Sequence, residues 1–506
     1  MYAFLDANPS KSLLFWTEDH KKVCFSGRSN ASLSAMNDGR IAQILRSRNV
    51  WWRDPHGWIA GDVALREAAD APFDYRPDPL NDIEPPGLYV LRGPRRVGKS
   101  VELKRAIARL IEQGVDPRSI IYCACNGFGA QDLRRVFAVG RNLVPANGPL
   151  HWVLDEVTAI GADWSAVVKD ARDDTQLAQD CVIVTGSSAR ELRDAEKNLA
   201  GRRGGVTRSN RLLMPMGFPA FCAAIGAETP GDDDANPLRP RDLLRPAGRE
   251  QIAEAGLWTE SLGDAWELYL DVGGFPRAVR GLREQGDAPE DFVDDLWAVV
   301  KDDAIRQRMG ETEAMALLAR LVDNLASPIN ASKLANDTGI DNHHRVNDRI
   351  GDLVATFLAW RCYQDRNGLP NTNAQRKVYF VDPLVARLPQ RRNPSFDNVD
   401  NSQLSEQQIG LAFAMAMESE RPGSFVDGTD VLYARTPSKT EIDFVGPRLE
   451  VAIESKYVDT NWKREAQTLA ARYGHGVVAT RRVLDLDGPV WAVPAGLLAW
   501  LVTPRP

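Results

Sequence analysis

The sequence predicts an α/β protein in which a parallel β-sheet is covered by helices on both faces. Apolar runs typical of strands alternate with helical patterns between residues 88 and 185, and a glycine-containing loop joins the first strand to the first helix. The chain has 506 residues, too many for one hydrophobic core, so we expect about three domains.

Each element of the sheet region has its own short signature. The expected strands are 88–91, 119–124, 150–154 and 181–185, and the expected helices are 99–112, 131–138 and 164–172. Strands separated by helices pair in parallel, because each helix carries the chain back to the same edge of the sheet. Residues 1–85, which contain tryptophans and turn signals, read as a segment that leads into this core.

Beyond the sheet region the pattern changes twice. The acidic, proline-containing stretch 228–237 is typical of an exposed insertion or linker, and the chain is then mainly helical to about residue 360. From about residue 405 an apolar helix precedes short strands, expected at 409–417 for the helix and at 431–434, 441–445 and 449–453 for the strands.

Composition limits the function classes. The 43% apolar and 26% charged residues are ordinary for a soluble globular protein, and the net charge of -7 argues against indiscriminate nucleic-acid binding while leaving local basic patches open. The chain start lacks a signal-peptide pattern and no apolar stretch could cross a bilayer, so we expect a cytoplasmic protein without a membrane partner. The six scattered cysteines fit a reduced compartment, and Cys123 and Cys125 alternate along one strand, which favours packing over metal binding.

Residues 93–100 read Gly-Pro-Arg-Arg-Val-Gly-Lys-Ser, the complete pattern of a phosphate-binding loop between a strand and a helix. Backbone N–H groups of such a loop surround the β-phosphate, Lys99 would reach the β- and γ-phosphates, and Ser100 would ligate Mg²⁺. We therefore expect ATP and Mg²⁺ as cofactors. The candidate nucleotide-binding residues are Gly93, Pro94, Arg95, Arg96, Val97, Gly98, Lys99, Ser100 and Val101.

Two further strand ends carry candidate hydrolytic residues. The strand that begins at His151 runs directly into Asp155, which would hold Mg²⁺, and Glu156, which would act as general base on the attacking water. The next strand ends in hydroxyl residues that could sense the γ-phosphate or position the water, namely Thr185, Ser187 or Ser188, although small hydroxyl residues also suit ordinary turns.

Arginines downstream are candidates for stabilising transition-state charge. Arg202 and Arg203 lie in a glycine-flanked basic loop, with Arg208 and Arg211 close behind, and an arginine supplied across a subunit boundary can accelerate phosphoryl transfer. A flexible surface loop or a contact to a nucleic-acid backbone are the alternatives. Arg277, in the first turn of a helix that begins after Gly273-Gly-Phe-Pro, is another candidate.

Taken together, the phosphate loop, Leu154-Asp-Glu, Thr185-Gly-Ser-Ser, Gly201-Arg and Gly273-Gly-Phe-Pro-Arg, in this order, resemble a large, mostly uncharacterised family of prokaryotic AAA-type ATPases. The resemblance covers nearly all of the chain beyond about residue 40 and implies a nucleotide sensor in the lid at Arg277. It implies no substrate, because the family has none in common.

The resemblance also implies an architecture: a P-loop AAA/RecA-like parallel sheet, a helical lid, a winged-helix-like segment and a C-terminal α/β domain of restriction-endonuclease-like fold. The boundaries we expect are 1–85 for the N-terminal segment, 86–225 for the ATPase core, 226–310 for the lid, 311–395 for the winged-helix-like segment and 396–506 for the nuclease-like domain.

The segment that starts at Pro328 resembles the family's helix-turn-helix. Small and apolar residues are spaced for a helix, a turn at Gly339 and a second helix, which would present His343, His344, Arg345, Asn347 and Arg349 to a DNA groove. Acidic residues are interspersed, so a packing module without DNA contact is the alternative. The histidine pair reads as surface rather than metal-binding.

Near the C-terminus, residues 441–456 resemble the core of the PD-(D/E)xK nuclease superfamily. Alternation places Glu454 and Lys456 on one strand face, and a hairpin would bring Asp443 beside them. The two carboxylates could bind Mg²⁺ with Lys456 stabilising the scissile phosphate, and Glu406 could add a ligand. Such a domain can also serve only in DNA binding or assembly.

The leading hypothesis is a Mg²⁺-dependent ATPase that assembles into a homo-oligomer, with a hexamer as one candidate, and that moves or remodels DNA, including branched DNA. One alternative is a nucleotide-dependent signalling or defence switch triggered by a protein partner. Another is a nuclease gated by the ATPase.

Overall fold

The computed structural model describes residues 36–505 except 145–147, 175–176, 187–190, 193–194, 196–197, 207, 232–236, 307–308 and 437–439. In this part of the chain, no helix combines the length and the apolar character needed to cross a lipid bilayer.

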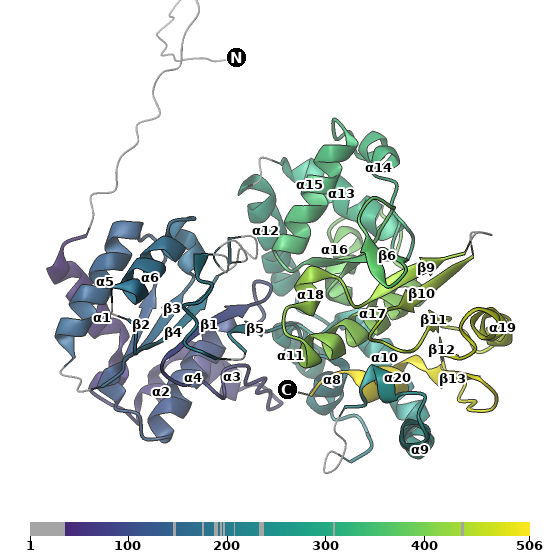
Figure 1. The fold of residues 1–506 in the computed structure, drawn as a ribbon, viewed down its shortest axis with the longest axis horizontal. Helices are drawn as coiled ribbons and strands as arrows, with labels where there is room; N and C mark the ends of the chain where they lie inside the picture. Colours follow the sequence, from purple (N-terminus) through teal and green to yellow (C-terminus); the bar gives the residue numbers. More distant parts are fainter. Residues whose placement is uncertain are drawn as a thin grey trace, which may run out of the picture. The chain divides into compact units, whose positions relative to one another are not determined.

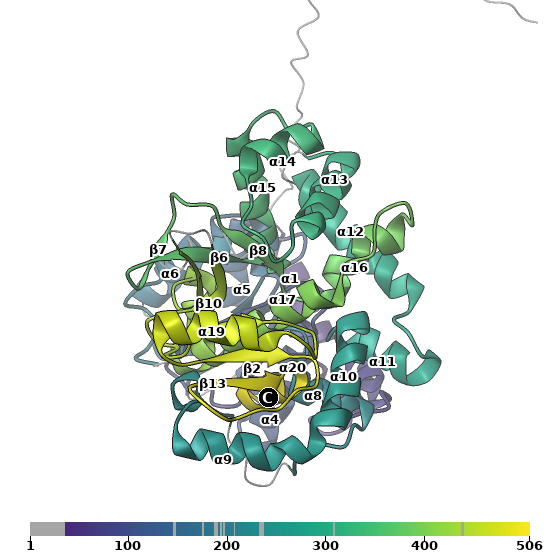
Figure 2. The ribbon, with the colours of Figure 1, turned by 90° about the vertical axis from the view of Figure 1, so that its right-hand side faces the viewer.

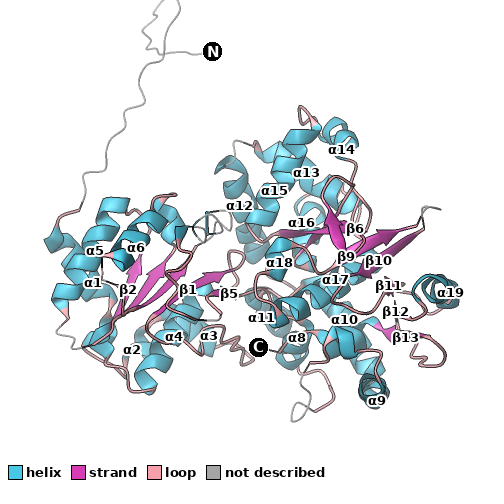
Figure 3. Cartoon of the chain, in the orientation of Figure 1, coloured by secondary structure: helices cyan, strands magenta, loops and turns pink. Residues whose placement is uncertain are grey.

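The region from Gly87 to Leu212 is built on a parallel sheet, as the sequence predicts (Figures 1 and 3). Within the described residues its order is β2-β3-β4-β1-β5, and each neighbouring pair runs in parallel. The strands are β1 (Gly87–Arg92), β2 (Ile120–Ala124), β3 (His151–Asp155), β4 (Cys181–Thr185) and β5 (Asn210–Leu212). Because the strands are parallel, the residues that follow β1, β3 and β4 meet at one edge.

Helices cover both faces of this sheet, because neighbouring residues of each strand point to opposite sides. Leu88 and Val90 of β1 belong to one core with α1, α5 and α6, whereas Tyr89 and Leu91 belong to another with α3 and α4. The helices are α1 (Asp38–Arg48), α2 (Trp58–Gly61), α3 (Val63–Ala69), α4 (Lys99–Glu112), α5 (Ala130–Leu143) and α6 (Trp164–Asp173). Helices α1, α2 and α3 lie within residues 1–85, for which the sequence analysis predicts no helices or strands.

A run of helices follows the first sheet. They are α8 (Phe218–Ile225), α9 (Pro246–Ala255), α10 (Thr259–Val272), α11 (Pro276–Gln285), α12 (Glu290–Arg306), α13 (Glu311–Asp323), α14 (Ala331–Thr338) and α15 (His343–Ala355). Gly339 ends α14 in the left-handed conformation, with φ 72°, and the Asn342 side chain caps α15 by accepting from the Arg345 N–H at 3.0 Å. The expected helix, turn and helix are therefore present.

The second sheet has the described order β13-β12-β11-β10-β9-β6-β7, with β8 paired to β6. Its strands are β6 (Ala359–Arg366), β7 (Leu369–Asn371), β8 (Lys377–Phe380), β9 (Leu432–Arg435), β10 (Glu441–Val445), β11 (Ile453–Ser455), β12 (Gly476–Thr480) and β13 (Val490–Pro494). Strands β6 and β9 pair in parallel. The sheet therefore combines strands from both sides of residue 395, the boundary expected between the last two domains.

Helices also flank this second sheet. Figure 2 shows α19 beside β13, and α19 also contacts β12. Its Trp462 and Leu469 pack with alternate strand residues such as Val478. The opposite face packs against α17 and α20 in a core that extends from Met214 to Val502. The helices are α16 (Pro383–Arg392), α17 (Asn401–Glu420), α18 (Ser424–Asp427), α19 (Trp462–Tyr473) and α20 (Ala495–Val502).

Candidate nucleotide site

The phosphate loop has the backbone that its glycines make possible. Gly93 has φ 148°, and a Cβ there would lie 1.9 Å from the carbonyl oxygen of Leu213, so no other residue fits without displacing that strand. Gly98, with φ 103°, leads directly into α4. Arg96 also adopts a positive φ, of 68°, which is uncommon for a residue with a side chain. The loop therefore turns sharply at the N-terminus of a 14-residue helix, a favourable place for an anion.

Lys99 lies inside this loop rather than in solvent. Its side chain is buried, and Nζ donates to the carbonyl oxygens of Gly93 at 2.9 Å and Pro94 at 2.8 Å. The ammonium group is thus held where the loop curls, and phosphate oxygens could take the place of the two carbonyls. Gly93 and Pro94 contribute through their backbone.

Asp155 is held by hydroxyl groups from two neighbouring strands. Its Oδ1 accepts from Thr185 Oγ1 at 2.8 Å, and its Oδ2 accepts from Tyr122 Oη at 2.9 Å. Burial, and then the nearby Asp155 carboxylate, raise the pKa of Tyr122, so the phenol stays protonated and can donate. Sequence reasoning missed Tyr122, because its contact with Asp155 depends on the pairing of β2 with β3.

Glu156 follows Asp155 in the left-handed region, with φ 57°. Its N–H donates to Thr185 Oγ1 at 3.2 Å, and its Oε1 accepts from Thr158 Oγ1 at 3.3 Å. Thr185 therefore links the two acidic residues, and its expected role in sensing the γ-phosphate or positioning the water stays a prediction. The other two hydroxyl candidates, Ser187 and Ser188, lie outside the described residues.

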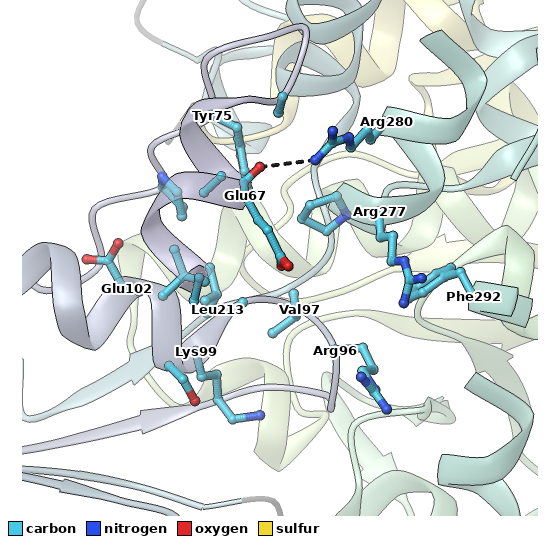
Figure 4. A pocket seen from close by; sticks show the side chains of 18 of the residues that line it. Glu67, Tyr75, Arg96, Val97, Lys99, Glu102, Leu213, Arg277, Arg280 and Phe292 are labelled. Carbon is cyan, nitrogen blue, oxygen red and sulfur yellow. Dashed lines mark hydrogen bonds between the residues drawn. The ribbon is translucent and has the colours of Figure 1, made fainter. Parts of the chain in front are cut away.

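The phosphate loop, Asp155 and Glu156 line one cavity of about 1030 Å³. Figure 4 shows its phosphate-loop side chains, with Lys99 and Arg96, opposite residues of α11 and α12. A third wall comes from α3 and the segment after it, including Phe73 and Tyr75, which the sequence did not mark as part of the site. The cavity lining includes these predicted residues: Arg95, Arg96, Val97, Gly98, Lys99, Ser100, Val101, Asp155, Glu156 and Arg277.

Arg277 lies in the cavity wall, but its guanidinium contacts acidic residues of α12. It donates to Asp295 at 2.9 Å and to Asp291, and its Cζ lies 5.9 Å from the centre of the Phe292 ring. Asp295 also lies 3.5 Å from the guanidinium of Arg96 in the phosphate loop. A single carboxylate therefore faces both arginines.

A second contact joins α11 to the N-terminal segment. Arg280 donates to the carbonyl oxygen of Glu67 at 3.1 Å, drawn as the dashed line in Figure 4. Residues of α11 and α12 thus form part of the cavity wall.

Arg202 and Arg203 lie near the end of the sheet at which β1 begins, whereas the phosphate loop follows the end of β1. The Arg203 carbonyl accepts from the N–H of Leu88, near the start of β1, at 3.2 Å. Gly93 lies five positions after Leu88, a span of about 17 Å along the strand. Arg202 contacts Asp173 through two nitrogens, at 2.8 and 3.0 Å. Neither arginine is positioned to reach a nucleotide in its own chain, so their catalytic role stays a prediction about another subunit.

The C-terminal candidates come together as expected. The N–H of Asp443 donates to Glu454 Oε2 at 3.4 Å, and Lys456 Nζ lies 3.6 Å from Glu454 Oε1. A lysine that the sequence analysis did not assign, Lys377, lies 2.9 Å from both Asp443 Oδ1 and Glu406 Oε1. Among the residues that the structure describes, no cluster of three or more His, Cys, Asp or Glu side chains is arranged to hold a metal ion.

The second helix of the helix-turn-helix exposes only part of the predicted set. His343 and His344 are exposed, with ring centres 4.0 Å apart, and Arg345 pairs with Asp341. The prediction that Arg349 faces a DNA groove was wrong: it is buried and lies 3.5 Å from Asp352, because the helical repeat turns it toward α13.

Comparison with known proteins separates two regions. Residues 86–222 match the family described as "AAA domain", and residues 263–390 match a family described as "Domain of unknown function (DUF8612)". No curated protein matches the chain.

Several archaeal structures are distantly similar. A Walker-type ATPase of Pyrococcus abyssi is 15% identical, with a TM-score of 0.34 over 65% of this chain and 93% of its own. The Aeropyrum pernix ORC1 protein, in complex with DNA, is 15% identical, with a TM-score of 0.27 over 71% of this chain and 91% of its own. The Cdc6p protein of Pyrobaculum aerophilum is 15% identical, with a TM-score of 0.22 over 62% and 90%. Likeness at this level establishes no shared function.

The family match covers the parallel sheet, the phosphate loop and the two acidic residues, and it agrees with the motif and the strand order. Residues 86–222 of this chain form an AAA-type P-loop ATPase domain.

Proposed function

We propose that this protein is a Mg²⁺-dependent ATP hydrolase. The observation that carries the proposal is the single cavity into which the phosphate loop, Asp155 and Glu156 all project. ATP hydrolysis needs cationic and N–H donors for the phosphates, oxygen ligands for Mg²⁺ and a base for water, and the cavity contains all three.

Each residue has a role that follows from its position. Lys99 binds the phosphates, and the hydroxyl of Ser100 and the carboxylate of Asp155 are the oxygen ligands suited to Mg²⁺. Both line the cavity, so the donor set fits this ion, which supplies charge neutralisation when bound. Tyr122 and Thr185 fix the Asp155 carboxylate, and Glu156 accepts the proton of the attacking water.

We further propose that nucleotide occupancy acts on the C-terminal half through α11 and α12. These helices border the cavity, and their apolar residues belong to the core shared with α14, α15 and the second sheet. A phosphate that attracts Arg96 and Arg277 would weaken their contacts with Asp295, so α12 is the element that would respond.

DNA is the partner we propose for this response, within a homo-oligomeric motor. The supporting observation is the α14–α15 pair, in which the N-terminal turn of α15 exposes His343 and His344, with half-buried Arg345 alongside. The acidic neighbours Asp341 and Asp348 favour a few specific contacts over general affinity for phosphate.

The test is ATP turnover measured with single-stranded, duplex, forked and four-way DNA at several salt concentrations. We expect at least one duplex or branched form to bind, with affinity that falls steeply as salt rises, and to stimulate turnover. A variant with His343→Ala and His344→Ala should lose the stimulation and keep basal turnover. Absence of binding to every DNA at low salt would refute the DNA role and leave a nucleotide-dependent switch with a protein partner.

A further inference from the structure

A buried lysine lies at the centre of the acidic cluster in the C-terminal half. Lys377, on β8, is 0% exposed. Among the described residues, three carboxylates contact its Nζ: Glu441 at 2.7 Å, Glu406 at 2.9 Å and Asp443 at 2.9 Å. The ammonium group donates hydrogen bonds to Glu406 and Asp443 and forms an ion pair with Glu441.

The carboxylates are themselves fixed by further contacts. Tyr379 donates its hydroxyl to Glu406 Oε1 at 2.6 Å, and the N–H of Ser455 donates to Asp443 Oδ2 at 2.9 Å. The groups come from β8, α17, β10 and β11. The lysine is thus the shared partner of acidic residues from different elements.

Lys377 remains charged in this environment. Burial alone lowers the pKa of a lysine, but Asp443, Tyr379, Glu406 and Glu441 together raise the pKa of Lys377 well above its ordinary value. A buried ammonium without partners would be strongly destabilising, whereas here it offsets the repulsion among the carboxylates.

The ammonium occupies the position that a divalent cation would need in order to bridge Asp443 Oδ1 and Glu406 Oε1. A cation that ligates Asp443 and Glu406 at oxygen-ligand distances of about 2.0–2.6 Å would lie close to Nζ, where like charges repel. The two cations therefore compete for the same oxygens.

We propose that Lys377 replaces a divalent cation between Asp443 and Glu406, so that this acidic cluster does not support metal-dependent cleavage. The inference goes beyond the ATPase function and does not depend on it. It also predicts that a metal site becomes available when the lysine is neutralised.

The test measures Mn²⁺ binding by electron paramagnetic resonance in nucleotide-free full-length protein. The wild type should show no Mn²⁺ binding that depends on Asp443, and Lys377→Met should gain one equivalent per chain. Adding Asp443→Asn to Lys377→Met should remove that gain, which separates this site from weak binding at the phosphate loop. Lys333→Met, at an exposed lysine of α14, is the matched control and should behave as the wild type.

The wild type provides a test that does not require the variant to fold. Mn²⁺ titration of the wild type and of Asp443→Asn should give the same curve, and neither should cleave the four DNA forms with Mg²⁺ or Mn²⁺. An Asp443-dependent Mn²⁺ site or DNA cleavage in the wild type would overturn the proposal. So would a folded Lys377→Met variant that gains no Mn²⁺.

Discussion

At the scale of single residues, neighbouring groups in the cavity have separable tasks. Lys99 lies within the phosphate loop, where its ammonium group donates to the Gly93 carbonyl, and the role we propose for it is to bind the nucleotide phosphates. Glu156 also lines the cavity, with its N–H bonded to Thr185 and its carboxylate bonded to Thr158, and the role we propose for it is to act on water. Loss of the first therefore affects binding, and loss of the second affects hydrolysis.

Lys99→Ala should weaken ATP binding by about a hundredfold or more, because charge-assisted contacts contribute about 1.5–3 kcal/mol each and the lysine makes several. Calorimetric titration with ATP and Mg²⁺ measures the effect. Lys104→Ala, on the same helix but paired with Asp62, is the control and should bind normally. Equal affinities for the wild type and Lys99→Ala would contradict the assignment.

Glu156→Gln should bind ATP as the wild type does and hydrolyse it about 10²–10⁴-fold more slowly, the usual contribution of a general base. Steady-state phosphate release and nucleotide titration together separate the two effects. Glu112→Gln, at the exposed end of α4, should leave both unchanged. A fall in affinity equal to the fall in turnover would assign Glu156 to binding.

The buried carboxyl group of Asp382 should make the free energy of unfolding depend on pH. Burial raises the pKa of this carboxyl from 3.8 to about 7, although the N–H groups of Gly274 and Leu384 donate to it at 2.7 and 2.9 Å. The folded state therefore binds a proton more tightly than the unfolded state, so this contribution to stability is full below the unfolded pKa and is lost as pH rises through about 7.

Urea unfolding between about pH 5 and pH 8 should show the free energy of unfolding falling with pH, by up to a few kcal/mol from this group. Asp382→Asn should flatten the dependence over that interval. The exposed Asp348→Asn is the control and should keep the wild-type profile. An unchanged profile in Asp382→Asn would show that other groups cause the dependence.

At the scale of elements, sequence patterns predicted the parts that local rules determine. Helix α4 begins and ends where the pattern placed it, and β4 matches residue for residue, because each is bounded by strong turn signals. The helices of residues 36–85 and strand β5 were missed: α2 and β5 are too short to show a period, and tertiary packing stabilises them.

The candidate sites also contain residues that the sequence could predict and residues that it could not. Motif residues from Arg95 to Glu156 could be predicted, because phosphate chemistry requires them in a fixed order. Tyr122 and Lys377 could not, because their partners are 33 and 66 residues away in sequence for Asp155 and Asp443 and only the sheet pairing brings them together.

The basic loop makes a prediction about assembly, because its arginines lie about 17 Å along β1 from the phosphate loop. Arg203→Ala should lower turnover by about a thousandfold while nucleotide affinity is kept, if it acts on a neighbouring subunit. Arg202→Ala should do so only if the ion pair with Asp173 opens in the assembly.

Mixed oligomers provide the measurement. Neither Arg203→Ala nor Glu156→Gln alone should turn over ATP at the wild-type rate, but mixing them places an intact arginine beside an intact glutamate in some interfaces. Partial recovery is the expected result. The absence of recovery in oligomers shown to contain both variants would assign the loop to structure, and Arg208→Ala, whose guanidinium donates to Ser419, serves as the control.

At the scale of the whole molecule, the contacts of Asp295 connect the phosphate loop to the helical region. Asp295→Asn should tighten ATP binding by about two- to fivefold, because half-exposed ion pairs contribute about 0–1 kcal/mol and the phosphates would no longer compete with this carboxylate. Equilibrium titration with ATP measures it. Asp294→Asn, whose partner is Arg392, is the neighbouring control, and weaker binding in Asp295→Asn would reverse the proposed coupling.

The pairing of β6 with β9 has a practical consequence for work on fragments. A chain cut after residue 395 would keep β6 and Lys377 and lose β9, Glu406, Glu441 and Asp443, which leaves an unpaired strand edge beside a buried charge without its partners. Exposed strand edges recruit other strands, so such fragments should aggregate through edges that are internal in the intact protein. Their self-association would then say nothing about the assembly of the full chain.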